Sequence, residues 1–110
     1  MIKSMSFLKR KPGITKEEFS RHWKDVHAPI AARLIPGLER YVQNHPIDIP
    51  ELESEFDGIA EMWWESMEAA MKYPLWHESD EAAPLREDEA KFFDTKKMFR
   101  FFAEEHIIIK

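Results

Sequence analysis

Residues 15–45 read TKEEFSRHWKDVHAPIAARLIPGLERYVQNH, and this stretch decides the fold. Thr15 and Glu18 have the spacing of a capping box, in which two side chains bond the free backbone N–H groups at a helix start. Four apolar side chains then recur at the spacing of a single helical face: Phe19, Trp23, Val26 and Ile30. This pattern predicts an amphipathic helix that lies on a sheet.

Pro29 interrupts the predicted helix. Because proline has no backbone N–H, it cannot bond the carbonyl of Asp25 as a regular helix requires. We therefore expect a kink or a new helical start between Val26 and Pro29, which leaves His27 at the irregular point. The proline and glycine at 36–37 then end the helical stretch.

The rest of the chain extends this pattern to a complete α+β unit. Alternating side chains predict strands over residues 1–9, 38–45, 56–65 and 97–109. Ser66 should cap a short helix that stops at Pro74, with Met67, Ala70 and Met71 on one face. An irregular segment over 75–79 precedes a second helix over 84–92. The order β-α-β-β-α-β predicts a ferredoxin-like fold, a four-stranded antiparallel sheet with helices on one face.

Aromatic side chains occur on both faces of the predicted third and fourth strands. Trp63 alternates with Trp64, and Phe101 alternates with Phe102. If the helices cover one face, the other face of a lone subunit exposes a large apolar patch. We therefore expect a homodimer that forms sheet to sheet.

Length and composition narrow the possible functions. A chain of 110 residues has the size of one domain, so we expect a single domain over residues 1–110. Charged residues make up 34% of the chain and the net charge is -5, which disfavours nucleic acid as a partner. The sequence has no cysteine and no apolar run long enough to span a bilayer. We expect a soluble cytoplasmic protein without a membrane partner.

Three short segments carry a resemblance to a known family. They are His27-Ala28-Pro29, Tyr41-Val42-Gln43-Asn44-His45 and Asp57-Gly58-Ile59-Ala60-Glu61. In this order along the chain, they resemble the EthD family of small dimeric α+β barrel proteins. Relatives include proteins linked to ether degradation, lactone isomerases, polyketide cyclases and cofactor-free monooxygenases.

The resemblance implies a small-molecule enzyme. We expect a cofactor-independent oxidoreductase or monooxygenase that acts on a small aromatic, ether, lactone or polyketide-like compound through proton transfer by histidine. No glycine-rich phosphate loop is present, so no cofactor is expected. The alternatives are a lactone isomerase or polyketide cyclase, a non-catalytic ligand-binding or accessory protein of a degradation pathway, and a haem-degrading protein with histidine as the available iron ligand.

His27 is the first of four candidate catalytic residues. Its imidazole can exchange a proton near neutral pH, and it lies at the edge of the apolar stripe, where a cleft between helix and sheet would open. An alternative role is to bond the carbonyl that Pro29 leaves free.

The other candidate catalytic residues lie on strands. Tyr41 and His45 share a strand face and could present a phenol and an imidazole to one pocket, or be a core residue and a strand end. Glu61 would have a raised pKa if it faced inward. It could instead pair with Arg40 or Arg100 across the sheet.

Five further residues are candidates for substrate binding: His22, Trp23, Trp63, Trp76 and His77. Tryptophan rings suit the wall of an apolar site. Trp76 and His77 are expected in a loop that forms a lid, or else as a core plug and an exposed histidine. On a regular helix His22 and His27 would point about 140° apart, which disfavours a shared metal. We therefore expect no metal site and place His22 at the sheet edge.

Overall fold

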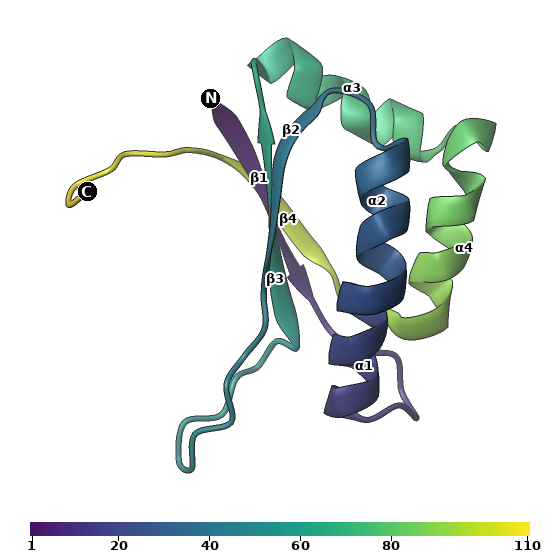
Figure 1. The fold of residues 1–110 in the computed structure, drawn as a ribbon, viewed down its shortest axis with the longest axis vertical. Coiled ribbons are helices and arrows are strands. Elements are labelled where there is room, and N and C mark those ends of the chain that lie inside the picture. Colours follow the sequence, from purple (N-terminus) through teal and green to yellow (C-terminus); the bar gives the residue numbers. More distant parts are fainter.

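The computed structural model describes residues 1–110. Figure 1 shows the sheet nearly edge-on, with the helices on one side of it. The sheet has four antiparallel strands in the order β2-β3-β1-β4. The strands are β1 (Ile2–Leu8), β2 (Leu38–Asn44), β3 (Gly58–Trp64) and β4 (Phe99–Glu104). This arrangement confirms the predicted ferredoxin-like α+β fold.

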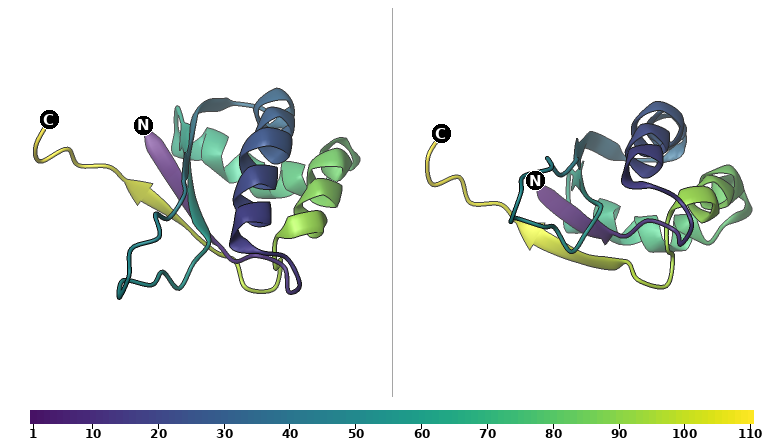
Figure 2. Two further views of the ribbon diagram at one scale, coloured as in Figure 1. Left: turned by 60° about the horizontal axis from the view of Figure 1, so that its bottom comes forward. Right: turned by 90° about the horizontal axis from the view of Figure 1, so that it is seen from below.

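The helices form one layer that is built from two connections. The first contains α1 (Lys16–His22), the π-helical segment η1 (Trp23–His27) and α2 (Ala28–Leu34). The second contains α3 (Met67–His77), the short 3₁₀ turn η2 (Asp80–Ala82) and α4 (Ala83–Phe92). Figure 2 shows that both connections cover the same face, while the C-terminal tail leaves on the opposite side. No helix combines the length and the apolar character needed to cross a bilayer.

The core lies between the sheet and the helix layer in two neighbouring clusters. Phe19 and Trp23 from the first connection are fully buried in one of them. Trp64 and Tyr73 lie in the other, with their ring centroids 5.5 Å apart. Burial of each large apolar side chain contributes about 1.5–3 kcal/mol, so these rings fix the two layers against each other.

The first connection starts and breaks where the sequence predicted. Thr15 caps α1, because its hydroxyl accepts a hydrogen bond from the N–H of Glu18 at 3.0 Å. In η1 the N–H of Ala28 bonds the carbonyl of Trp23, five residues earlier, which is the hydrogen bond of a π-helix. The next helix, α2, has Pro29 in its first turn, where proline needs no partner for a missing N–H.

The π-helical turn changes which side chains face the sheet. Val26 was predicted to belong to the apolar stripe, but it is 45% exposed, whereas His27 is 4% exposed. A π-turn takes up more residues than an α-turn, so the inward positions fall four apart in the sequence. These buried residues are Phe19, Trp23, His27, Ala31 and Ile35.

The helix α3 begins at its predicted cap but does not end at Pro74. Ser66 Oγ accepts a hydrogen bond from the N–H of Ala69 at 3.1 Å, and the helix continues to His77. Proline removes one hydrogen bond from a helix. The burial of the Tyr73 side chain holds this turn against the sheet and outweighs the missing hydrogen bond. The predicted stop at Pro74 is therefore wrong.

The buried face of α3 also differs from the prediction. Ala70 is buried as expected, but Met67 and Met71 are 48% and 50% exposed. The helix therefore presents Ala70 and Tyr73 to the core. The two methionines lie toward solvent, because the sequence pattern alone did not determine how the helix rotates about its axis.

The last strand is shorter than predicted. β4 ends at Glu104, and the three isoleucines at 107–109 are exposed. Glu104 pairs with Ile2, the first residue of β1, so the chain beyond it has no neighbouring strand left to bond. The prediction of a strand that extends to residue 109 is wrong for this reason.

The helix-free face of the sheet carries a group of aromatic side chains, which we call the open-face patch: Phe7, Phe56, Phe99 and Phe101. Neighbouring rings in this patch have centroids 5.3 to 6.1 Å apart. Phe99 and Phe101 are 62% and 50% exposed. An exposed aromatic group on this face is what the sequence predicted for a lone subunit.

Trp63 lies on the same face but is not exposed. The ammonium group of Lys3 is 5.2 Å from its ring centroid, and the guanidinium of Arg40 is 4.5 Å from it. These cation–π contacts leave Trp63 5% exposed. The apolar area of this face is therefore smaller than the sequence indicated.

Candidate active site

The most buried polar group of the helix layer is built around Asp88 in α4. One oxygen of its carboxylate is 2.9 Å from Nδ1 of His27, and the other is 2.9 Å from Nε2 of His22. Asp88 and His27 are 3% and 4% exposed, while His22 is partly exposed. Two histidines of one helical segment thus hold a single buried carboxylate of another helix.

This arrangement contradicts the prediction that His22 and His27 point in different directions. The prediction assumed a regular α-helix, on which residues five apart diverge by about 140°. In a π-turn the hydrogen bond joins residues five apart, so such residues lie one above the other. The turn therefore brings both imidazoles to α4, and His22 does not lie at the sheet edge.

The contacts of His27 define its tautomer. A carboxylate only accepts hydrogen bonds, so Nδ1 carries the proton that points to Asp88. Burial lowers the pKa of His27, and the hydrogen bond to Asp88 only partly opposes this effect. The neutral ring is therefore favoured, with Nε2 as an unprotonated base. The alternative that the ring bonds the carbonyl freed by Pro29 does not hold, because Asp88 takes that position.

His27 lines a small cavity between the helices and the sheet. Its volume is about 20 Å³, and ten of its 14 lining residues are hydrophobic. Such a volume admits about one water-sized group. The ligand-sized cleft that the sequence predicted is therefore closed in this structure. Met98 and Arg100 line the cavity from the side of the edge strand β4.

Tyr41 lines the same cavity from β2 and belongs to a chain of hydrogen bonds. Its hydroxyl is 2.9 Å from Nε2 of Gln43, and Oε1 of Gln43 is 2.8 Å from Nε2 of His45. Nδ1 of His45 is 2.6 Å from the hydroxyl of Ser20. The strand thus brings Tyr41 and His45 to one face, as predicted, but only Tyr41 lines the cavity.

Both ionisable groups of this chain have shifted pKa values. Burial raises the pKa of Tyr41, so its phenol stays protonated. Burial lowers the pKa of His45, and the charge of Lys24 acts in the same direction. At neutral pH all side chains joined by these hydrogen bonds are therefore uncharged.

Glu61 does not share the cavity with His27. It alternates with the inward residues Ala60 and Met62 and lies on the open face, where its carboxylate is 3.9 Å from Nζ of Lys3. The inward orientation that a catalytic role would need is therefore absent. The ion pair is with Lys3, because the Arg40 guanidinium lies over the Trp63 ring and Arg100 donates from Nε to Ser6 Oγ.

The predicted lid residues belong to α3 instead of a loop. Trp76 is half-buried, and its ring lies 6.0 Å from that of Tyr73. Nε2 of His77 is 2.8 Å from Oε1 of Glu89, a second buried acid of α4. Neither Trp76 nor His77 lines the His27 cavity. Trp63 is on the opposite face of the sheet. Trp23 is the one predicted binding tryptophan that the structure places at the cavity.

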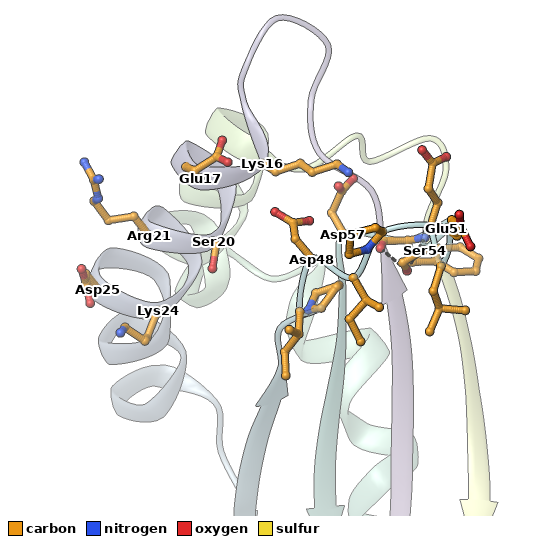
Figure 3. A pocket seen from close by; sticks show the side chains of 17 residues that line it. Lys16, Glu17, Ser20, Arg21, Lys24, Asp25, Asp48, Glu51, Ser54 and Asp57 are labelled. Atoms are coloured by element: carbon orange, nitrogen blue, oxygen red, sulfur yellow. Dashed lines mark hydrogen bonds between the residues drawn. The ribbon is translucent and has the colours of Figure 1, made fainter.

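A larger groove lies outside this site, between α1 and the loop that joins β2 to β3 (Figure 3). Its volume is about 740 Å³, and only four of its 17 lining residues are hydrophobic. Lys16 and Lys24 come from the helical side, and Asp48 and Glu51 from the loop. The groove contains none of the residues that were predicted to act in catalysis, and its charged lining does not suit an apolar ligand.

Three functional groups were missed by sequence reasoning: Asp88, Gln43 and the indole N–H of Trp23. Asp88 lies three residues after Leu85, so both share a helix face, and a carboxylate beside a buried leucine requires a partner. That requirement was the available signal. The role of Gln43 depends on contacts across helix and strand that spacing does not reveal.

Comparisons with known proteins agree with the fold. A family model described as EthD domain matches residues 11–96. An EthD family protein from Bacillus halodurans is 26% identical, with 96% of this chain and 100% of that chain covered and a TM-score of 0.70.

Two more distant structures share the fold. A protein from Arabidopsis thaliana is 16% identical, with both chains covered to 100% and a TM-score of 0.70. A dimeric protein of ferredoxin-like fold from Bacteroides fragilis is 9% identical, with 94% and 95% covered and a TM-score of 0.63. The chain has no match among curated proteins.

Proposed function

The chain belongs to the EthD family, and from this premise we propose that it is an enzyme that moves a proton of a small, mostly apolar molecule without a bound cofactor. One observation carries the proposal. A buried histidine, positioned by a buried carboxylate at 2.9 Å, lines a cavity with a mainly hydrophobic wall. Such a site combines a base with a water-excluded environment, in which the fixed Asp88 carboxylate acts strongly on the charge that forms on the imidazole.

In the proposed reaction Nε2 of His27 accepts a proton from the substrate. The ring becomes an imidazolium, and the Asp88 carboxylate at Nδ1 stabilises its charge. Return of the proton to another atom completes an isomerisation or a cyclisation. In a cofactor-independent oxidation, the reaction class that we favour from the sequence, the carbanion left by deprotonation is oxidised by dioxygen. A carbon–oxygen bond forms, and the proton on His27 passes to the resulting hydroperoxide.

Substrate binding requires the cavity to open. Of the walls, the side of β4 is the best suited to move, because β4 is an edge strand and pairs only with β1. Met98 is a flexible side chain. Arg100 is exposed, and it is held by Ser6 Oγ at 3.1 Å from its Nε and by the Tyr73 ring, whose centroid is 4.9 Å from its guanidinium. We place the entrance there, on the far side of the cavity from the charged groove.

A second candidate function is ligand binding without catalysis. The closed cavity favours it, because a volume of about 20 Å³ is compatible with a site filled by its own side chains. In that case His27, Asp88 and His22 would be a structural cluster that joins η1 to α4.

Hydrogen exchange distinguishes the two functions. The protein is incubated in D₂O with a panel of small aromatic ketones and lactones, and loss of the proton next to the carbonyl is followed by NMR. We expect exchange for at least one compound, and its loss in His27→Gln. His22→Gln is the matched control, since it removes the other imidazole from Asp88 and should retain most of the rate. Equal rates in His27→Gln and the unchanged protein would exclude the base.

The remaining expectations from the sequence stay proposals. We propose that residues 1–110 form one EthD domain, that it is cytoplasmic, and that it pairs as a homodimer through the open-face patch. The exposed rings of Phe99 and Phe101 support the pairing, and the related protein from Bacteroides fragilis is dimeric.

A further inference from the structure

Trp23 has a buried polar atom without a partner. The side chain is fully buried, and its indole Nε1 is the one buried side-chain nitrogen or oxygen that lacks a hydrogen bond. An indole N–H can only donate, so it requires an acceptor. Buried groups of this kind are rare, and an unexplained one in a cavity wall indicates a place for a ligand atom.

Tyr41 supplies a second donor at the same cavity, because its hydrogen bond with Gln43 determines where its hydroxyl proton can point. Nε2 of Gln43 is 3.0 Å from the backbone carbonyl of Trp23 and 2.9 Å from the Tyr41 hydroxyl. Because a carbonyl only accepts, this end of the side chain must be the amino group. The Tyr41 oxygen therefore accepts from Gln43, and its own proton is free to point elsewhere.

The outer part of the chain agrees with this direction. Oε1 of Gln43 accepts from Nε2 of His45, which leaves Nδ1 of that ring as the acceptor for the hydroxyl of Ser20. The Trp23 carbonyl thus fixes which group donates and which accepts in every hydrogen bond of this series. The result is that the phenol of Tyr41 acts as a donor toward the cavity that it lines.

The two donors and the base belong to the wall of one cavity. Trp23, Tyr41 and His27 all line one cavity of about 20 Å³, so the two donors and the base act on the same small volume. Two charged side chains also line it, Arg100 and Glu89, and Oε1 of Glu89 is 2.8 Å from Nε2 of His77. This combination is that of an oxyanion-binding site beside a general base.

We propose that Trp23 Nε1–H and Tyr41 Oη–H bind the oxygen of a carbonyl substrate and stabilise the enolate that His27 generates. The inference rests on the proposed function and names its substrate class: small ketones, lactones or related compounds with a hydrogen on the carbon next to the carbonyl. Nε2 of His27 takes that proton, the C–H electrons form a carbon–carbon double bond, and the carbonyl oxygen becomes the enolate oxygen. Return of the proton to carbon restores a carbonyl, so the step needs no oxidant.

A stable phenolate tests the donors without turnover. The probe is 4-nitrophenol, whose neutral and ionised forms differ in absorbance, titrated with the protein at several pH values. We expect the protein to bind the phenolate more tightly than the phenol. Hydrogen bonds to a charged group are the strong ones, so Tyr41→Phe should reduce this preference by about ten- to a hundredfold. Gln43→Glu should have a similar effect, because a carboxylate would accept the Tyr41 proton and turn it away from the cavity.

Matched variants keep the test specific. His106→Gln changes an exposed side chain outside the cavity and should keep the preference. His27→Gln should abolish deuterium exchange, whereas Tyr41→Phe should weaken the preference for phenolate, so failure of the base and failure of the donors are separate results. Circular dichroism confirms that each variant is folded.

Three outcomes would overturn the proposal. They are equal affinity for phenol and phenolate, no binding at millimolar 4-nitrophenol, and a preference that is lost in Arg100→Gln but retained in Tyr41→Phe. The last result would assign the anion to the guanidinium that lines the cavity instead of to the neutral donors.

Discussion

Proton binding to His27 should affect folding as well as chemistry. Burial lowers its pKa in the folded protein below the ordinary value of 6.5. Between these two pKa values the unfolded chain binds more protons than the folded one, so the free energy of unfolding falls as the pH falls. The stabilising effect is complete above 6.5 and is lost as the pH drops toward the folded-state pKa. His45 has a lowered pKa and contributes in the same direction.

Urea unfolding at a series of pH values between about 8 and 5 measures this effect. We expect the unchanged protein to lose stability across the range, and His27→Gln to show a shallower slope. His106→Gln removes an exposed histidine of the C-terminal tail and should leave the slope unchanged. An equal slope in His27→Gln and the unchanged protein would contradict the lowered pKa.

Gly58 should be required because it touches the Trp23 ring. A Cβ added at Gly58 would overlap Cζ3 of Trp23 and lie 2.8 Å from Cη2. The indole is fully buried and cannot move aside. We expect Gly58→Ala to lower the free energy of unfolding by about 1–3 kcal/mol, the usual effect of overpacking.

A double-mutant cycle identifies the contact responsible. Trp23→Phe removes the atoms that meet the new methyl group, so Gly58→Ala should be less destabilising in that background. Additive effects of the two substitutions would mean that Gly58 acts through its backbone and not through Trp23.

Within the helices, Pro74 is an exposed proline in the interior of α3. Replacing it by alanine restores the N–H that can bond the carbonyl of Ala70 and removes an unfavourable helix residue. The gain is reduced because alanine leaves the unfolded chain more flexible. We expect Pro74→Ala to raise the free energy of unfolding by about 1–2 kcal/mol in chemical denaturation. Lys72→Ala, at an exposed position of the same helix, should change it little, and a loss of stability in Pro74→Ala would show that the proline shapes the turn.

Local signals predicted where the helices begin and where the first connection breaks, but not where α3 and β4 end or how the elements face each other. The cap at Thr15 and the break before Pro29 follow from hydrogen-bonding rules that act within a few residues. The orientation of His22 relative to His27 depends on the number of residues in one turn, and the predicted angle of about 140° assumes the α-helical number. One π-turn therefore moved a predicted edge residue into contact with the buried carboxylate of Asp88.

The site could be predicted only in part for the same reason. His27 and Tyr41 were found because their chemistry and positions were unusual. Asp88 and Gln43 act through contacts between elements, which the sequence does not encode as a local pattern. Glu61 shows the opposite error, since its apolar neighbours indicated burial while the helices cover the other face of β3.

At the scale of the whole molecule, the two faces of the sheet differ in how they are covered, and this difference bears on assembly. The helix layer covers one face of the sheet (Figure 1). On the other face the open-face patch exposes Phe99 and Phe101. Contact of this patch with the patch of a second copy would bury both, which is the usual basis of a two-fold dimer. β4, which carries Phe99 and Phe101, also provides Arg100 on the opposite side at the cavity. Pairing would therefore restrain the backbone of β4, so in the dimer the side chains of Met98 and Arg100 would be the parts that move at the cavity entrance.

The substitution Phe101→Glu tests this assembly. A charge in the middle of the patch would be buried without a partner, so the dimer should dissociate. Light scattering coupled to size exclusion at micromolar protein should show the unchanged chain as a dimer and Phe101→Glu as a monomer. Met71→Glu is the matched control, because Met71 is as exposed as Phe101, at 50%, but lies in α3. Pairing through the sheet would be excluded if the unchanged protein were monomeric, or if Met71→Glu dissociated the dimer and Phe101→Glu did not. A face that stays in water tolerates a carboxylate, so the substitution that dissociates the dimer identifies the face that is buried.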